Sequence, residues 1–229
     1  MKTIFLVDAD DTVLDFHGAS AVALKSAFAD CGIEWREEYA ATFKTINDGL
    51  WESLERKELT RAELIECRFP LYLQTLGITS VDGGEFNKHY LHSLATKPLF
   101  VEGAQAFLTE LKKRGRVYIV TNGTERIQRS RFEICKLWEY IDDAFISDCI
   151  GFDKPAKEYT DYVLSHIENF DKAKAVWIGD SLSADVRAAN DAGIDSIWYN
   201  PAQKPLNGKA QPQYIAVSFA QILQILWKI

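Results

Sequence analysis

Five short apolar runs constrain the fold of this chain more than any other feature of its sequence. Each run ends abruptly in a polar or glycine-containing turn, and none alternates apolar with polar residues, which indicates strands buried on both faces of a parallel sheet. From residue 99 onward the runs alternate with helical patterns, so we predict an α/β fold with helices on both faces of the sheet. The runs are Thr3–Val7, Val117–Val120, Ala144–Ile146, Ala175–Ile178 and Ser196–Tyr199.

A long helical block interrupts this rhythm. Residues 17–97 read as four helical stretches with no convincing strand among them. The block is far longer than the ~10–15 residues that usually connect neighbouring parallel strands. We therefore predict an all-helical domain at 17–97, inserted into a core built from residues 1–16 and 98–229.

One helix of the core can be outlined closely. Ala104, Phe107, Leu108 and Leu111 follow the spacing of a single helical face. Three basic residues come next, where they suit the negative end of a helix dipole, and Gly115 suits the C-cap. We therefore expect a helix that ends just before Gly115.

Length and composition narrow the class of protein. The 229 residues, 47% hydrophobic and 26% charged, fit one globular core with a modest insertion. The net charge of −7 provides no general attraction to a nucleic-acid polymer or to an anionic membrane. No apolar window approaches the ~18 residues of a membrane span, and Asp8 interrupts the first apolar run too early for a secretory segment. We expect a cytoplasmic monomer or homodimer, with its four widely spaced cysteines reduced and mostly buried.

Two carboxylates follow the first predicted strand. Asp8 and Asp10 are separated by one residue, so alternation would point both side chains toward the strand ends, where α/β proteins bind ligands. Such a pair suits a nucleophile and a general acid–base, with a divalent cation offsetting their repulsion. Turn and helix-cap chemistry by Asp10, Asp11 and Thr12 would account for the same pattern.

Two further segments offer groups for a phosphate. Thr121, Asn122 and Gly123 end the second strand, and their hydroxyl, amide and backbone N–H groups could cradle a phosphate at a helix N-terminus. A simple Asn-Gly turn would look the same. Lys154 precedes Pro155, which suits the first position of a helix, and its ammonium could neutralise a phosphoryl oxygen or remain solvated.

A second acidic pair follows the fourth predicted strand. Asp180 comes directly after Gly179, and Asp185 lies five residues further on, one turn into the next helix. Both side chains could face a cation at the strand ends. Helix capping and an ordinary surface acid would also explain this segment on its own.

Taken in order, these four segments resemble the motifs of the haloacid dehalogenase-like superfamily of phosphohydrolases. The resemblance spans nearly the whole chain, and it implies a Rossmann-like core with the helical block as the family's small cap domain. The matching segments are Asp8-Ala9-Asp10-Asp11-Thr12 for D-x-D-x-T/V, Thr121-Asn122-Gly123 for the strand-end Thr/Ser motif, Lys154 for the motif lysine, and Gly179-Asp180 through Asp185 for G-D-x(4)-D.

The resemblance implies a two-step phosphoryl transfer. Asp8 would attack phosphorus and become an aspartyl-phosphate, while Asp10 would protonate the leaving oxygen and later activate water. It further implies Mg²⁺ held by the carboxylates of Asp8 and Asp180 and the backbone carbonyl of Asp10, with Asp185 acting mainly through water. The phosphoryl oxygens would be held by Thr121, Asn122, Gly123 and Lys154. Dehalogenases of the superfamily lack the second aspartate, so Asp10 favours phosphate chemistry.

A finer resemblance is to the bacterial pyrimidine 5′-nucleotidase branch. It implies (deoxy)pyrimidine nucleoside 5′-monophosphates as substrates and a selective role for residues of the helical block, although Trp51 and Phe69 would serve equally well in packing. The residues that carry it are Asn47, Leu50, Trp51, Arg68 and Phe69, together with Lys157, Trp198 and Asn200.

Other functions remain open at this stage. A sugar-phosphate or phosphoglycolate phosphatase, or a phosphomutase, would share the same four motifs, because the cap selects the substrate. A phospho-receiver module also uses Asp, Mg²⁺ and Lys, but it is usually shorter and places its phosphoacceptor after a later strand. A non-catalytic binding protein on the same scaffold would usually have lost one of the chemical positions, all of which are filled here.

Overall fold

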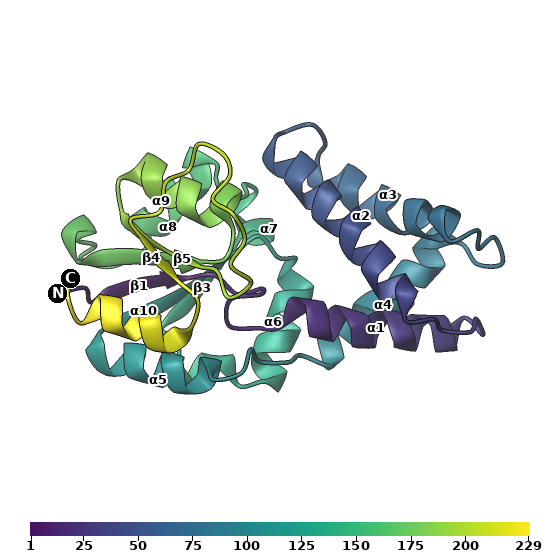
Figure 1. The fold of residues 1–229 in the computed structure, drawn as a ribbon, viewed down its shortest axis with the longest axis horizontal. Helices are drawn as coiled ribbons and strands as arrows, with labels where there is room; N and C mark the ends of the chain where they lie inside the picture. The colour runs from purple at the N-terminus through teal and green to yellow at the C-terminus, as the bar shows by residue number, and fades with distance from the viewer. The chain divides into compact units, whose positions relative to one another are not determined.

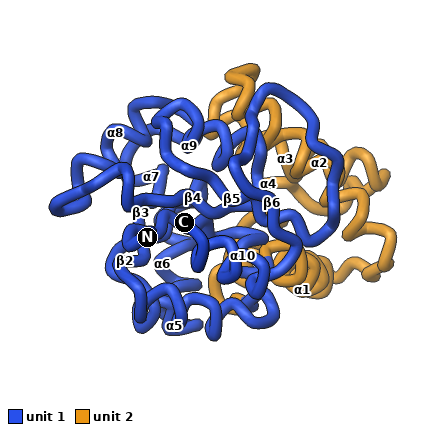
Figure 2. Tube along the Cα trace, turned by 60° about the vertical axis from the view of Figure 1, so that its left-hand side comes forward, with its two compact units in different colours: residues 1–15, 99–229 blue, residues 16–98 orange.

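The computed structural model describes all residues from 1 to 229, and they form two compact units (Figure 2). Residues 1–15 and 99–229 make up the first, called here the core unit, and residues 16–98 make up the second, called the helical unit. These junctions differ by one residue from the domain bounds that the sequence led us to expect. No helix in either unit is both long and apolar enough to span a membrane.

The core unit contains one sheet of six parallel strands in the order β3-β2-β1-β4-β5-β6. All five predicted strands are present, and the first in sequence is central, paired on both sides. The sixth was not predicted, because it is only three residues long and lies at the sheet edge, where Ile215 is exposed. The strands are β1 Ile4–Val7, β2 Arg116–Thr121, β3 Asp143–Ile146, β4 Ala175–Gly179, β5 Asp195–Tyr199 and β6 Tyr214–Ala216.

Helices cover both faces of this sheet, as predicted (Figure 1). Phe5 and Val7 of β1 pack on one face with α5 and α10, while Ile4 and Leu6 pack on the other with α8 and α9. Every residue of β1 is therefore buried, which is why its sequence shows no polar alternation. The helices of this unit are α5 Ala104–Arg114, α6 Glu125–Ile134, α7 Ser147–Ile150, α8 Lys157–Ser165, α9 Arg187–Ala192 and α10 Phe219–Leu226.

Helix α5 has the bounds and the buried face that its sequence predicts, and Gly115 is its C-cap. Two local predictions elsewhere in the chain are wrong, one about Pro155 and one about the cysteines. Pro155 does not begin a helix: it lies in a turn closed by the Ala156 N–H and the Asp153 carbonyl, so α8 begins at Lys157. The cysteines are free but not mostly buried, since Cys149 is exposed and the other three are partly exposed.

The helical unit consists of four helices around an aromatic core. Its helices are α1 Phe16–Asp30, α2 Glu38–Glu55, α3 Arg61–Thr75 and α4 Gly83–Thr96. A reciprocal capping box between Thr60 and Glu63 begins α3, and Asp82 caps α4. The interior is a cluster of ring-to-ring contacts among Phe28, Phe43, Phe69, Tyr72, Phe86 and Tyr90.

Candidate active site

Three carboxylates meet where β1 and β4 end. Because these strands are parallel neighbours, Asp8 after β1 and Asp180 after β4 come to the same edge of the sheet. Asp185 joins them, so that ligand oxygens of all three acids lie within 4.8 Å of one another. Asp8 and Asp185 are buried and Asp180 is partly exposed.

Lys154 lies against two of these acids. Its Nζ donates to Asp8 Oδ1 at 2.6 Å, to Asp185 Oδ1 at 2.7 Å and to the Val120 carbonyl at 2.8 Å. The side chain is 2% exposed, so all three donors of the ammonium are used inside the protein. A buried lysine with this set of partners holds the acidic residues of two different segments together.

Burial raises the pKa of Asp8 to about 8, against the opposing effect of the Lys154 charge. The pKa of Asp180 is raised by burial and by the neighbouring carboxylates of Asp8 and Asp185. Burial alone would lower the pKa of Lys154, but Asp185 and Asp8 outweigh it and raise that pKa. One ammonium cannot neutralise three carboxylates, so the donor set and its charge fit a divalent cation such as Mg²⁺.

Local structure fixes the position of Asp185. The indole Nε1 of Trp177 donates to Asp185 Oδ1 at 3.2 Å, and the Ser181 N–H donates to Oδ2 at 3.2 Å. The Ser181 side chain caps a short π-helical turn over Leu182–Val186 that carries Asp185 inward. A Cβ at Gly179 would lie 2.3 Å from Asp185 Oδ2, so only glycine permits this approach.

The segment after β2 is tied to the lysine loop. Asn122 Nδ2 donates to the Lys154 carbonyl at 2.9 Å, and the Lys154 N–H donates to Asn122 Oδ1 at 2.7 Å. The Asn122 carboxamide therefore holds the backbone that carries Lys154. Thr121 Oγ1 accepts from the Gly123 N–H at 3.1 Å, which folds the strand end into a tight turn.

Asp10 has partners that the sequence reasoning missed. Its Oδ1 accepts from Arg131 Nη1 at 2.6 Å and its Oδ2 from Gln128 Nε2 at 2.8 Å. Gln128 and Arg131 are each 1% exposed and lie one turn apart on α6, the helix that follows Thr121–Gly123. The sequence does show a glutamine and an arginine three residues apart on the helix that follows β2, and this spacing could have pointed to them. Which polar residues of α6 face inward, however, depends on how the helix is rotated.

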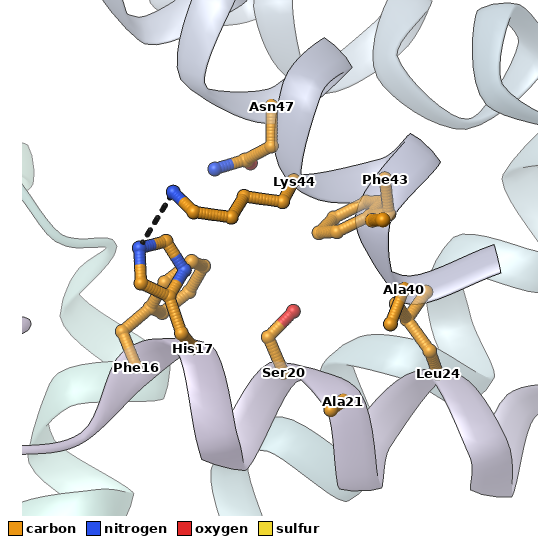
Figure 3. A pocket seen from close by; sticks show the side chains of 10 residues that line it. Phe16, His17, Ser20, Ala21, Leu24, Ala40, Phe43, Lys44 and Asn47 are labelled. Carbon is orange, nitrogen blue, oxygen red and sulfur yellow. Dashed lines mark hydrogen bonds between the residues drawn. The ribbon is translucent and has the colours of Figure 1, made fainter. Parts of the chain in front are cut away.

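The candidate selectivity residues of the helical unit differ in their burial and in whether they line a cavity. Asn47 is 3% exposed and lines a cavity of about 190 Å³ (Figure 3). Arg68 is buried over the rings of Phe43, Phe69 and Tyr90, and its Nη1 donates to Asn47 Oδ1 at 3.2 Å. Phe69 is fully buried in the aromatic core. Trp51 is half-buried, its ring lies under the Arg61 guanidinium, and it does not line the cavity.

Three further residues of the finer resemblance lie in the core unit. Trp198 Nε1 donates to the Asp180 carbonyl at 2.8 Å, so it supports the backbone of a site residue. Asn200 bonds Lys204 through both ends of its carboxamide and shapes a loop. Lys157 is exposed and pairs with Asp161.

Comparison with known proteins agrees with this architecture. A model of haloacid dehalogenase-like hydrolases matches residues 2–193. The HAD-hydrolase YfnB of Bacillus subtilis is 36% identical, over 96% of this chain and 94% of that protein. Its crystal structure bound to magnesium has a TM-score of 0.93 and covers 98% of both chains.

Two bacterial relatives are named pyrimidine 5′-nucleotidases. PynA of Streptococcus pneumoniae is 34% identical over 97% of this chain and 94% of its own, and YjjG of Escherichia coli is 26% identical over 96% of each. The chain therefore belongs to the haloacid dehalogenase-like hydrolase family. Within that family it is an enzyme of the phosphatase type.

Replacing Lys154 should destabilise the protein. In Lys154→Met the carboxylates of Asp8 and Asp185 stay buried without their cation, and we expect a loss of about 3 kcal/mol in the free energy of unfolding, measured by urea denaturation. Lys157→Met is the matched control, since this exposed i,i+4 pair should contribute less than about 0.5 kcal/mol. Equal urea midpoints for Lys154→Met and the wild type would show that the buried ion pairs do not stabilise the fold.

Proposed function

We propose that this chain is a Mg²⁺-dependent phosphomonoester hydrolase that acts through an aspartyl-phosphate on Asp8 and prefers pyrimidine nucleoside 5′-monophosphates. The observation that carries the chemistry is the meeting of Asp8, Asp180 and Asp185, of which Asp8 and Asp185 pair with Lys154. Asp10 stands beside this group with partners of its own, Arg131 and Gln128. Asp8 is thus paired with Lys154, whereas Asp10 is held separately by Arg131 and Gln128, which suits a division into nucleophile and proton carrier.

The residues that would hold Mg²⁺ are the carboxylates of Asp8 and Asp180 and the backbone carbonyl of Asp10, with Asp185 in support. All are oxygen donors, which Mg²⁺ prefers, and their excess negative charge suits a dication. Bound there, the ion would neutralise charge on the phosphoryl oxygens and on the attacking carboxylate.

Within this proposal the chain's own residues perform two steps. An Asp8 oxygen forms a bond to phosphorus as the bond to the leaving oxygen breaks, and Asp10 gives that oxygen a proton. Asp10 then takes a proton from the water that attacks the aspartyl-phosphate and releases inorganic phosphate. Lys154 would act by its charge on the phosphoryl oxygens, and the Thr121 hydroxyl and the backbone N–H groups near Gly123 would hold them, so that catalysis rests on positioning and charge.

The preference for pyrimidine nucleotides is supported by the relatives PynA and YjjG and by the cavity of the helical unit. The Arg68 guanidinium only donates hydrogen bonds, so the Asn47 carboxamide must turn its Oδ1 to Arg68. Figure 3 shows the Asn47 nitrogen on the side of the cavity where Lys44 and His17 lie. A cavity edge that donates fits the C4 carbonyl oxygen of uracil and thymine, where cytosine carries an amino group, against an apolar wall that includes Phe43 and Leu24.

Asp8→Asn should abolish turnover while the fold is kept, because an amide of nearly the same volume is a poor nucleophile. We expect a fall in kcat of ~10⁴-fold or more, measured by phosphate release from a nucleotide. Asp161→Asn on the exposed face of α8 is the control and should keep the wild-type rate. A purified Asp8→Asn protein with a tenth of the wild-type rate would exclude Asp8 as the nucleophile.

Activity should vanish in excess chelator and return on addition of Mg²⁺. Mg²⁺ should also raise the melting temperature of the wild type, since a ligand that binds only the folded state stabilises it. Both responses should weaken more in Asp180→Ala than in Asp185→Ala, because we place Asp180 in direct contact with the ion and Asp185 behind it. Full activity in chelator would contradict the metal-dependent mechanism.

Substrate preference should follow the donor edge of the cavity. At equal subsaturating concentrations we expect dUMP and dTMP to give higher kcat/KM than dCMP, hexose phosphates or phosphoglycolate. Asn47→Asp replaces a donor by an acceptor and should lower kcat/KM for dUMP by ~10-fold or more, since a mismatched buried polar contact costs ~1–3 kcal/mol. Glu52→Gln, further along α2, exposed and paired with Arg56 rather than with the cavity lining, is the control and should keep the wild-type value.

A sugar phosphate or phosphoglycolate that exceeded every pyrimidine nucleotide in this panel would overturn the nucleotidase assignment and leave the phosphatase assignment standing. Interconversion of sugar-phosphate isomers without phosphate release would indicate a phosphomutase instead.

A further inference from the structure

Gln128 and Arg131 form a closed hydrogen-bond network with Asp10. Arg131 Nη1 donates to Asp10 Oδ1 at 2.6 Å and to Gln128 Oε1 at 2.8 Å. Gln128 Nε2 donates to Asp10 Oδ2 at 2.8 Å and to Thr121 Oγ1 at 2.9 Å. Both oxygens of the Asp10 carboxyl are therefore held, each by a different side chain of α6.

This network is unfavourable in free energy if its only role is packing. Arg131 is 1% exposed, and its Nε and Nη2 are buried with no hydrogen-bond partner. Burying a guanidinium with unused donors is unfavourable, and a buried ion pair seldom stabilises a fold more than an apolar pair of similar volume. The Asp10 side chain is 30% exposed, so it could be hydrated without Arg131. Fold stability alone gives little reason for an arginine at this position.

Gly123 gives independent support for the same network. A Cβ at this position would lie 2.4 Å from Gln128 Cγ and 2.5 Å from its Nε2. Gly123 therefore leaves room for the Gln128 amide to reach Asp10 and Thr121. The strand-end turn of β2 is therefore shaped to accommodate Gln128.

We propose that Gln128 and Arg131 are positioning residues for proton transfer by Asp10. The inference rests on the proposed function, in which Asp10 gives a proton to the leaving oxygen and later takes one from water. Each carboxyl oxygen of Asp10 keeps a second lone pair, so one of them can carry that proton while both bonds to α6 persist. Gln128 and Arg131 themselves neither gain nor lose a proton, and their effect is to restrict Asp10 to one rotamer.

The test compares two esters that need the proton unequally. An alkyl ester such as dUMP requires protonation of its leaving oxygen, whereas p-nitrophenolate departs readily without a proton. Since kcat/KM for both esters reports the enzyme up to formation of the aspartyl-phosphate, we expect Arg131→Met to lower it ~10–100-fold for dUMP and less than ~3-fold for p-nitrophenyl phosphate. Gln128→Met should act in the same direction.

The matched control is Arg129→Met. Arg129 lies on the same helix, is exposed, and pairs with Glu125 rather than with the site. It should leave kcat/KM for both esters at the wild-type value. Arg131→Lys keeps the charge and one donor and should recover part of the loss on dUMP, which a general defect in helix packing would not predict.

A double-variant cycle ties the effect to Asp10. In an Asp10→Asn background, Arg131→Met should cause no further loss on dUMP, because the group that it positions is gone. If Arg131→Met does not fold, Gln128→Met and Arg131→Lys carry the same comparison.

The outcomes separate the two proposals. Equal losses on both esters in variants of an active wild type would overturn the positioning role and leave the phosphatase reaction standing. A further loss from Arg131→Met in the Asp10→Asn background would overturn it as well. A metal-loaded wild type inactive on both esters would overturn the proposed function, and the positioning role with it.

Discussion

The buried ammonium of Lys154 is the interaction on which the rest of the site depends. It bonds Asp8 after β1, Asp185 in the turn after β4 and the carbonyl of Val120 in β2. These groups come from three neighbouring strands, so the lysine fixes how the strand ends are spaced as well as how charge is distributed. Asn122 in turn fixes the lysine's backbone. A change at any of these positions would reach the others through a shared partner, so they act as one unit.

Most of the fold could be predicted, because strands buried on both faces leave an apolar run that needs no tertiary information. The grouping of the candidate site residues could be predicted from the same apolar runs, since polar residues directly after parallel strands must meet at one edge of the sheet. The partners of Asp10 were out of reach: whether Gln128 and Arg131 face inward depends on how α6 is rotated, and long polar residues on a helix usually face water. β6 is too short to show a sequence pattern. In the helical unit, aromatic residues that pack in the core cannot be distinguished by sequence from aromatic residues that would stack on a base.

In the helical unit, the residues that pack the interior also orient a polar side chain at its cavity. Its aromatic cluster encloses Arg68, whose charge has no carboxylate partner among the contacts described, and the rings of Phe43, Phe69 and Tyr90 lie against the guanidinium. Cation–π attraction offsets part of the cost of burying that charge. Arg68 Nη1 donates to Asn47 Oδ1 while Nε has no acceptor, so the buried guanidinium orients the Asn47 amide at the cavity wall. Within the proposed function, residues of this cluster that touch no ligand would thus decide which functional group the cavity accepts.

The central place of β1 in the sheet has a consequence for the order in which the protein is made. β1 is synthesised before both of its neighbours in the sheet, β2 and β4, which begin at Arg116 and Ala175. The helical unit is continuous in sequence from residue 16 to 98 and can complete its contacts while β1 is still unpaired. Contacts of such long sequence separation form slowly, and an unpaired apolar strand is prone to aggregate. The nascent chain therefore carries an unpaired β1 while the whole helical unit is synthesised, and this interval is the stage at which a chaperone would matter most.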